Sequence, residues 1–357
     1  MSTTIPVTTA NGNYPIHVGT GLLHSAGKII REALSSKRIA IITDANVGAL
    51  YGKMLEDSLL ETGFSPAIIS ITPGEGSKSF AAVEKISDDM ISLGFDRSSA
   101  VVALGGGVVG DLAGFVAAVY FRGIPIVQIP TSIVAQVDSA IGGKTGINSR
   151  LGKNLVGAFH QPKVVIIDPA LLKTLPARER NEGFAEIIKH AAIRDVKMLS
   201  ELKCENAEEW ERLICRNAQI KAEIVSADVY EQSGLRALLN FGHTIGHGIE
   251  QAAGYGKLWH GEAISLGLIA ACHISEKRAK LPPEATDAIL QALKAFDLPT
   301  HLPSEISTDA ILTALRHDKK FSDGQIRFVL TNSLGSAFLS RDVTLEDIVE
   351  AIESLRN

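Results

Sequence analysis

The residues best suited to chemistry are three histidines that lie close together in the chain, His243, His247 and His260. His243 and His247 are four residues apart in a helix-compatible stretch (238–251), so both imidazoles leave the same helical face. Two imidazoles at this spacing and one later ligand can hold a divalent metal ion with an open coordination position. The residues alone predict His243, His247 and one of His260 or Glu262 as ligands; solvated or core histidines are the alternative.

A glycine-rich loop (105–110, Gly-Gly-Gly-Val-Val-Gly) follows a predicted buried strand and opens a predicted helix. In that context G-x-G-x-x-G allows a close backbone approach to a pyrophosphate at a helix N-terminus; a simple tight turn is the alternative. The loop departs from the ordinary fingerprint because it follows the third predicted strand and no acid ends a strand about 20 residues later. Asp44, which ends the first predicted strand, and Asn46 are better ribose ligands. We therefore predict a dinucleotide site in a variant nucleotide fold.

Residues 142–145 (Gly-Gly-Lys-Thr) imitate the end of a P-loop. A Walker A motif would need a glycine at the position of Asp138, so an NTPase is disfavoured. Lys144 is then expected on a flexible turn, where its ammonium suits a phosphate or carboxylate.

Several charged groups are expected where surface solvation does not explain them. Glu186 and Lys189 lie three apart in an apolar helical segment, where unpaired charges are costly. Glu186 is therefore a candidate metal ligand and Lys189 a candidate anion binder. Arg236 and Asn240 are expected on the same helix as His247. Together the candidate cations exceed what one nucleotide needs and predict a small, multiply anionic substrate, such as a phosphate that also bears a carboxylate, although any single one could simply solvate a surface: Lys144, Lys153, Lys189, Lys221, Arg236, Lys319 and Lys320.

Composition limits the class of protein. A chain of 357 residues suits two domains, and a net charge of −5 provides no basic field for nucleic acid or anionic membrane. Three cysteines, none in a CxxC, fit a reducing compartment without a disulfide framework. The first residues resemble no signal peptide, and no run reaches the roughly 18 apolar residues that a membrane span needs. We expect a cytoplasmic location.

The secondary-structure pattern predicts an N-terminal Rossmann-like parallel α/β nucleotide-binding domain (1–177) followed by a mostly α-helical metal- and substrate-binding domain (178–357). Val/Ile-rich strands are expected at 38–43, 67–71, 99–104, 125–129 and 164–167, and helices at 48–62, 80–93, 108–121 and 132–141. From about residue 178 the apolar period is helical, at 180–203, 206–226, 236–251 and 260–278. An extended pair (325–330 and 336–340) precedes a last helix that Thr344 and Asp347 cap. The active site is expected in the cleft between the domains.

Taken together, these motifs closely resemble the 3-dehydroquinate synthase family, sugar-phosphate cyclases of the shikimate pathway. The resemblance runs from about residue 44 to 320, most of the chain, and rests on several segments in the family's order. They are Gly74-Glu75 with Lys78, 106–115, 136–139, 142–145, 152–155, Glu186 with Lys189, 238–243 and 260–262. No single segment would be specific.

The resemblance implies a residue set. The metal ligands, for Zn²⁺ or Co²⁺, become Glu186, His243 and His260, and His247 instead faces the substrate. The implied NAD contacts are Asp44, Asn46, Glu75, Lys78, Gly106, Gly107, Val108, Val109, Gly110, Asp111, Thr131, Ser132, Lys144, Lys153, Leu171 and Thr174. The implied substrate contacts are Arg122, Asp138, Lys144, Asn154, Lys189, Lys221, Arg236, Asn240, His247 and one of Lys319 or Lys320. The implied catalytic residues are Lys144, Asn154, Lys189 and His247, and a homodimer is also implied.

The implied activity is a lyase reaction that converts 3-deoxy-D-arabino-heptulosonate 7-phosphate to 3-dehydroquinate and phosphate. It proceeds by transient NAD oxidation of a ring alcohol, β-elimination of phosphate, re-reduction, ring opening and intramolecular aldol closure. One departure from the family pattern is Gln232, where an acid four residues before Arg236 is usual; Glu231 is its neighbour, and the segment 228–233 is one residue longer than usual.

Three alternatives remain open at the level of sequence. A polyol dehydrogenase of the glycerol-dehydrogenase type would share the fold but would not need so many cations, and it would release NADH. A sibling cyclase would act on sedoheptulose 7-phosphate, which lacks the carboxylate; Asn240 and the set of Asp138, Lys144 and Asn154 favour the carboxylate-bearing sugar. An NAD-sensing protein without catalysis would not need the ligand triad.

Overall fold

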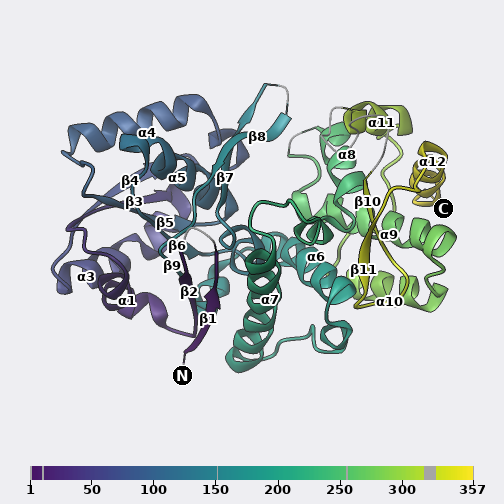
Figure 1. Ribbon diagram of the computed structural model, residues 1–357, viewed down its shortest axis with the longest axis horizontal. Coiled ribbons are helices and arrows are strands. Elements are labelled where there is room, and N and C mark those ends of the chain that lie inside the picture. Colours follow the sequence, from purple (N-terminus) through teal and green to yellow (C-terminus); the bar gives the residue numbers. More distant parts are fainter. Residues whose placement is uncertain (1, 10–11, 151, 255, 317–326, 357) are drawn as a thin grey trace. The chain divides into compact units, whose positions relative to one another are not determined.

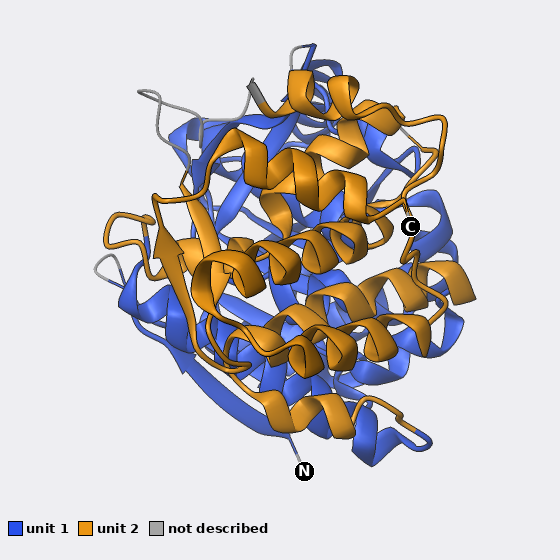
Figure 2. Cartoon of the chain, turned by 90° about the vertical axis from the view of Figure 1, so that its right-hand side faces the viewer, with its two compact units in different colours: residues 1–175, 205–229 blue, residues 176–204, 230–357 orange. Residues whose placement is uncertain are grey.

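The computed structural model describes residues 2–9, 12–150, 152–254, 256–316 and 327–356. The chain forms two compact units, shown in different colours in Figure 2. Unit 1 comprises Met1–Leu175 and Glu205–Val229, and unit 2 comprises Pro176–Cys204 and Tyr230–Asn357.

Unit 1 is built on a seven-stranded sheet in the order β1-β2-β9-β6-β5-β3-β4. All neighbouring strands are parallel except β1 and β2. The strands, labelled in Figure 1, are β1 (Thr3–Val7), β2 (Tyr14–Val18), β3 (Arg38–Asp44), β4 (Ser65–Ile71), β5 (Ala100–Gly105), β6 (Ile126–Pro130) and β9 (Val164–Ile167). The five strands predicted from the sequence are present, and the hairpin β1–β2 was not predicted.

Helices cover both faces of this sheet, which is why its strands are apolar without alternation. Ile39 and Ile41 of β3 pack into one core with Ile30 and Leu59, whereas Ala40 and Ile42 pack into another core with helices that follow β4 and β5. The helical segments of unit 1 are η1 (Leu22–Ser25), α1 (Ala26–Ala33), α2 (Ala45–Val47), η2 (Gly48–Gly52), α3 (Lys53–Glu61), η3 (Glu75–Ser77), α4 (Phe80–Ser92), α5 (Gly107–Val119), η4 (Tyr120–Arg122), η5 (Ala135–Ser139), η6 (Pro169–Thr174) and α7 (Ala207–Ala227).

A second hairpin in unit 1 corrects the expected setting of Lys144. Strands β7 (Lys144–Ser149) and β8 (Gly152–Phe159) pair antiparallel, and Lys144 opposes Phe159. Lys144 therefore begins a strand and does not lie on a flexible turn. The hairpin packs on α5 at Gly114, where a Cβ would lie 2.4 Å from the Thr145 side chain.

The helix α7 groups with unit 1, although the sequence division assigned its residues to the second domain. It contacts β1, β2, η5 and η6 of unit 1. The apolar period predicted this helix nearly residue for residue, but an apolar stripe does not identify the surface on which it packs.

Unit 2 is mostly helical, and its central helix α9 (His260–Ala279) packs against the helices α6, α8, α10 and α12. Its elements are α6 (Ala177–Ile193), η7 (Val196–Ser200), η8 (Arg236–Asn240), α8 (His243–Ala253), α9, α10 (Pro283–Lys294), α11 (Thr308–Arg316), β10 (Phe328–Thr331), β11 (Ala337–Ser340) and α12 (Leu345–Ser354). Strands β10 and β11 pair antiparallel, and the predicted capping box of Thr344 and Asp347 begins α12. No helix of the described part of the chain is long and apolar enough to cross a membrane.

The single helix predicted over 236–251 is wrong at its middle. The short segment η8 and the helix α8 are separate, because Gly242 adopts a left-handed conformation with φ of 78°. A Cβ at Gly242 would lie 2.8 Å from the backbone nitrogen of Leu268 in α9. Arg236 and Asn240 therefore precede the histidine helix and are not part of it, whereas His243 and His247 keep their shared face.

Candidate active site

Four side chains from three helices of unit 2 converge on one point. Glu186 comes from α6, His243 and His247 from α8, and His260 is the first residue of α9. The Nε2 atoms of His243 and His260 lie 3.2 and 3.1 Å from the same oxygen, Oε1 of Glu186. One ligand atom from each of the three histidines also lies within 4.8 Å of the others. This arrangement can hold a divalent ion with nitrogen and oxygen ligands.

In two of the histidines, His243 and His260, hydrogen bonds at Nδ1 fix the orientation of the ring. Nδ1 of His243 lies 3.2 Å from the carbonyl oxygen of Phe241, and Nδ1 of His260 lies 3.4 Å from Oε2 of Glu250. Metal-binding histidines commonly donate one N–H to such acceptors, which leaves the other nitrogen free to ligate. Both Nε2 atoms are thereby directed to Glu186, and this donor set fits Zn²⁺ or Co²⁺.

The electrostatics of the cluster also suit a cation. Burial alone would raise the pKa of the Glu186 carboxyl, but Lys189 and His243 outweigh it and hold that pKa well below its ordinary value. Burial lowers the pKa of His243. Burial would also lower the pKa of His260, but hydrogen bonds to Glu186 and Glu250 raise it to about 10. The two carboxylates that flank His260 favour a positive charge at this ring. A metal ion on Nε2 could supply that charge in place of the Nε2 proton.

Glu262, one of the two ligands left open by the residues alone, has a different role. Its carboxylate accepts the backbone N–H of Trp259 at 2.9 Å and pairs with both Nε and Nη2 of Arg178, at 2.7 and 2.8 Å. The Arg178 guanidinium also lies over the Trp259 ring, 4.3 Å from its centroid. Glu262 therefore caps α9, and His260 is the residue of that pair that reaches the cluster.

Close backbone packing sets the distance between the ligand helices α6 and α9. A Cβ at Gly261 would lie 2.0 Å from the carbonyl oxygen of Glu182, so only glycine allows this contact. The Gly261 N–H also donates to the Glu182 carboxylate at 3.2 Å. Glu182 lies one turn before Glu186, so the contact positions the neighbour of His260 directly on the helix that carries Glu186. Neither Glu182 nor Glu250 was predicted from the sequence.

The remaining predicted residues of unit 2 lie around this cluster or near it in the chain. Lys189 is fully buried and forms an ion pair with Glu186. Arg236 is also buried. Asn240 donates from Nδ2 to the Glu231 carboxylate at 3.1 Å, and Glu231 has a left-handed φ of 59°. The family usually has an acid at the position of Gln232. In this chain the neighbouring residue, Glu231, places its carboxylate beside Asn240 instead.

In unit 1 the predicted glycine loop joins β5 to α5, with Gly106 immediately before the helix. A Cβ at Gly106 or Gly107 would lie 3.4 or 3.1 Å from the hydroxyl of Ser132 or Ser139, respectively. The Thr131 N–H donates to the carbonyl of Gly105 at 3.0 Å, so the end of β6 lies beside the loop. The first N–H groups of a helix have no intrahelical acceptor and can bind an anion. The loop therefore fits a dinucleotide pyrophosphate.

A buried network links further predicted cofactor residues. Lys78 is 4% exposed, and its ammonium bonds to Asp111 at 2.8 Å and to the Asn154 side chain. Glu75 lies 3.7 Å from the same ammonium. Burial would lower the pKa of Lys78, but the carboxylates of Asp111 and Glu75 outweigh it and raise that pKa. Asn148, which was not predicted, bonds to Glu75 at 2.7 Å and accepts the Asn154 N–H at 3.0 Å.

Other predicted residues of unit 1 have defined partners. The Asp44 carboxylate caps α2 by accepting the N–H groups of Asn46 and Val47. The Tyr51 hydroxyl donates to the Leu171 carbonyl at 3.1 Å and lies 2.7 Å from the Thr174 hydroxyl, so these two residues share one neighbour.

The predicted substrate-binding residues of unit 1 include one ion pair and two exposed cations. Asp138 and Lys221 form an ion pair between η5 and α7. Arg122 is exposed and has a left-handed φ of 67°, and Lys144 is exposed at the start of β7. Lys153 is half-buried in β8. Lys319 and Lys320 lie outside the described residues.

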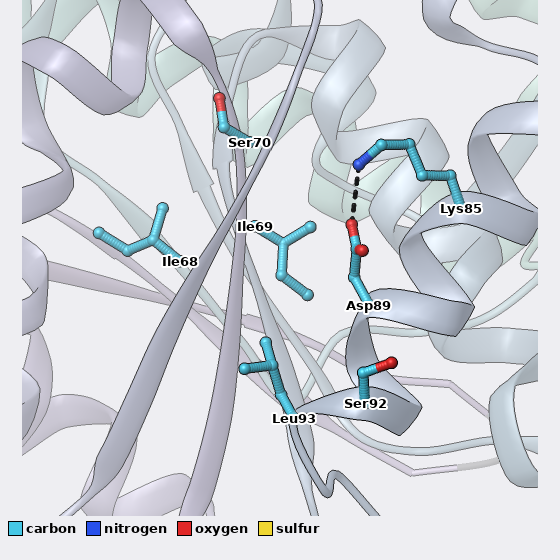
Figure 3. Close-up of a pocket in the computed structure, with 7 residues that line it drawn as sticks. All are labelled: Ile68, Ile69, Ser70, Lys85, Asp89, Ser92 and Leu93. Atoms are coloured by element: carbon cyan, nitrogen blue, oxygen red, sulfur yellow. Dashed lines mark hydrogen bonds and ion pairs between the residues drawn. The ribbon is translucent and has the colours of Figure 1, made fainter.

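A surface pocket of unit 1 contains none of the predicted residues. It is lined by Ile68, Ile69, Ser70, Lys85, Asp89, Ser92 and Leu93, as Figure 3 shows. Its two charged side chains, Lys85 and Asp89, are bonded to each other at 2.8 Å. The pocket offers no catalytic group and belongs to neither cluster described above.

Comparison with known families decides between the alternatives. The protein-family model for the 3-dehydroquinate synthase N-terminal domain matches residues 68–182 of this chain. The family model for the 3-dehydroquinate synthase C-terminal domain matches residues 183–321. The chain belongs to the 3-dehydroquinate synthase family. A 3-dehydroquinate synthase of Symbiobacterium thermophilum is 44% identical over 96% of this chain and 98% of the relative.

Solved structures agree with this family. A 2-epi-5-epi-valiolone synthase from Streptomyces hygroscopicus subsp. jinggangensis, with NAD⁺ and Zn²⁺ bound, is 31% identical, with a TM-score of 0.87 over 96% of each chain. A 2-deoxy-scyllo-inosose synthase, complexed with carbaglucose-6-phosphate, NAD⁺ and Co²⁺, is 27% identical, with a TM-score of 0.86 over 99% of each chain.

These comparisons confirm the predicted family, its fold of a parallel α/β domain followed by a helical domain, and the class of function, that of a 3-dehydroquinate synthase of the shikimate pathway. The roles of individual residues remain predictions.

Proposed function

We propose that this chain converts 3-deoxy-D-arabino-heptulosonate 7-phosphate to 3-dehydroquinate and phosphate, with NAD and Zn²⁺ or Co²⁺ as cofactors. The observation that carries the proposal is the convergence of Glu186, His243 and His260. The Nε2 atoms of the two histidines lie 3.2 and 3.1 Å from Oε1 of Glu186. The family supplies the substrate. The relative named for that activity is 44% identical, whereas the related valiolone synthase is 31% identical, so the carboxylate-bearing sugar is favoured over a sibling's substrate.

In this proposal Glu186, His243 and His260 hold the metal ion. Glu186 is preferred to His247 as the third ligand because one of its oxygens lies next to both other ligand atoms. When bound, the ion polarises and acidifies the alcohol of the substrate ring. His247, which lies one helical turn after His243, is then available to take the proton from that alcohol oxygen. Lys189 pairs with Oε2, the other oxygen of the buried Glu186, neutralises its charge and is also a proposed contact of the substrate.

The glycine loop 106–110 holds the NAD pyrophosphate, and Asp44 and Asn46 bind a ribose. NAD held there would supply reversible hydride transfer at the ring alcohol. The Lys78 network fixes Glu75 and Asp111 beside Asn154. The remaining proposed cofactor contacts come from Thr131, Ser132, Lys144, Lys153, Leu171 and Thr174.

Charged side chains bind the two anionic ends of the substrate. Lys144 and Arg236 stabilise the charge of the departing phosphate, and Asn154 assists proton transfer at the ring alcohol. Asp138, Lys221 and Asn240 contact the sugar, and Arg122 and one of Lys319 or Lys320 add charge partners for phosphate or carboxylate. The loss of phosphate is an elimination that the acidified C–H next to the transient ketone allows.

The deciding experiment is release of inorganic phosphate from the heptulosonate phosphate in the presence of catalytic amounts of NAD. The proposal expects many turnovers per NAD and no net accumulation of NADH at 340 nm. Sedoheptulose 7-phosphate serves as the parallel substrate. Turnover of that sugar alone would move the chain to a sibling activity, and stoichiometric NADH would indicate a polyol dehydrogenase.

We also propose a homodimer in the cytoplasm. The dimer rests on family resemblance. The location rests on a biosynthetic activity and on a sequence with three cysteines and no CxxC motif, which suits a reducing compartment. Light scattering of the purified protein tests the first; a mass of one chain would contradict it.

A further inference from the structure

We propose that Glu250 is the positioning residue that orients the His260 imidazole for metal binding and thereby sets how tightly the ion is held. This inference rests on the proposed metal site. It adds a carboxylate that contacts a ligand and not the ion.

The geometry places the His260 ring between two carboxylates. Its Nε2 lies 3.1 Å from Oε1 of Glu186, and its Nδ1 lies 3.4 Å from Oε2 of Glu250. Glu186 and Glu250 therefore occupy opposite nitrogens of one ring. An N–H at Nδ1 that donates to Glu250 fixes the tautomer whose Nε2 lone pair is free for a metal ion.

His260 needs this support more than His243 does. The His260 side chain is 34% exposed, whereas that of His243 is 8% exposed. The His243 ring is held by packing and by the carbonyl of Phe241, an acceptor in the main chain. About a third of the His260 side chain is exposed to solvent, so a side-chain acceptor has to resist rotation of the ring.

Glu250 is itself well placed to act as that acceptor. Its side chain is 8% exposed, and a buried carboxylate is stable only where it is paired or hydrogen-bonded. It follows His243 by seven residues on α8, a spacing that returns to the same helical face. The helix that supplies one ligand therefore also supplies the acceptor for the ligand on α9, which couples the two helices at the site.

The side from which Glu250 approaches the ring distinguishes positioning from ligation. Glu250 contacts His260 on the Nδ1 side, opposite the nitrogen that approaches Glu186. A carboxylate at Nδ1 also makes the opposite nitrogen a stronger donor to a metal ion.

The test is a Co²⁺ titration of the metal-stripped full chain, followed by its d–d absorption bands. Glu250→Gln keeps the side-chain volume and an acceptor but removes the charge, and Glu250→Ala removes both. We expect affinity to fall about 10–100-fold in Glu250→Ala, less in Glu250→Gln, with altered bands in both. Glu250→Asp should recover part of the affinity. Glu223→Gln on the exposed face of α7 is the matched control and should bind as the wild type does.

Three readings separate the outcomes. His243→Ala must lose the Co²⁺ bands; if it retains them, the proposed metal site fails, and this inference fails with it. If His243→Ala loses them while both Glu250 variants bind with wild-type affinity and bands, the metal site stands and the role of Glu250 is refuted. NAD affinity, which depends on unit 1, should stay within about twofold in every Glu250 variant and reports that the chain is folded.

Discussion

Replacement of Gly261 by alanine should separate the two helices that carry Glu186 and His260. The added Cβ would lie 2.0, 2.6 and 2.9 Å from three backbone atoms of Glu182, whereas ordinary contact begins at 3.4 Å. The helices α6 and α9 must therefore move apart by roughly 1.4 Å at this point, because backbone atoms cannot rotate away as a flexible side chain can. Metal–ligand distances tolerate only about 0.2 Å.

Two quantities should therefore change in Gly261→Ala. The free energy of unfolding should fall by about 1–3 kcal/mol, the usual consequence of overpacking, measured by urea denaturation. The affinity for Zn²⁺ or Co²⁺ should fall at least about tenfold, measured by competition with a chromophoric chelator. Gly52→Ala is the control, because its Cβ would make an ordinary 3.4 Å contact with the end of the Ile68 side chain. Wild-type metal affinity in Gly261→Ala would refute the view that this glycine sets the ligand spacing.

Three further predictions address other parts of the structure. His247→Ala should retain its metal content but lose at least about 100-fold in kcat, because it removes a proton-transfer group and not a ligand; loss of the metal would instead favour the set His243, His247 and His260. Lys78→Met should destabilise the protein to urea by about 3 kcal/mol and weaken NAD binding, because it leaves Asp111 and Glu75 without their buried cation; unchanged NAD affinity would contradict this. Asp347→Asn should lower the free energy of unfolding by about 2 kcal/mol at pH 7, because the carboxylate caps α12 and pairs with Arg278.

The effect of Asp347→Asn on the free energy of unfolding should also depend on pH. Burial alone would raise the pKa of Asp347, but the hydrogen bonds from Arg278 and Thr344 hold it below its ordinary 3.8. A depressed pKa in the folded state stabilises the protein above the ordinary pKa, and this stabilisation is lost as pH falls. The difference between wild type and Asp347→Asn should therefore be full at neutral pH and shrink below about pH 4. A difference that is constant down to pH 2 would contradict the assignment.

Much of the fold was predictable because its signals are local. The buried strands are continuous Val/Ile runs, α7 has an amphipathic period, and α9 is a long apolar segment that is buried on most sides. The hairpin β7–β8 was missed because its pairing rests on glycines: a Cβ at Gly157 would lie 2.1 Å from the carbonyl of Thr145. Such a close backbone approach leaves no strand pattern in the sequence. The interruption of the helix at Gly242 was missed for a similar reason, since its cause is the distant residue Leu268.

In the candidate site, too, the residues with a local signal could be predicted and those that depend on distant contacts could not. Glu186 could be singled out because a charge in an apolar helix needs a partner, and the histidine spacing marked α8. The residues alone nominated His243, His247 and one of His260 or Glu262. Spacing could not test His247, because one helical face accommodates a ligand and its neighbour equally, and it could not choose between His260 and Glu262. Glu250 and Asn148 had no signal, since each acts through a hydrogen bond to a residue distant in sequence or on another element. Glu231 is visible only as the neighbour of Gln232.

The most direct test is phosphate release by the purified protein after its divalent ions have been removed and NAD retained. The stripped protein should release no phosphate from 3-deoxy-D-arabino-heptulosonate 7-phosphate, and a single equivalent of Zn²⁺ or Co²⁺ should restore the rate in the wild type but not in Glu186→Gln. Full activity of the stripped protein, or full restoration in Glu186→Gln, would contradict the account.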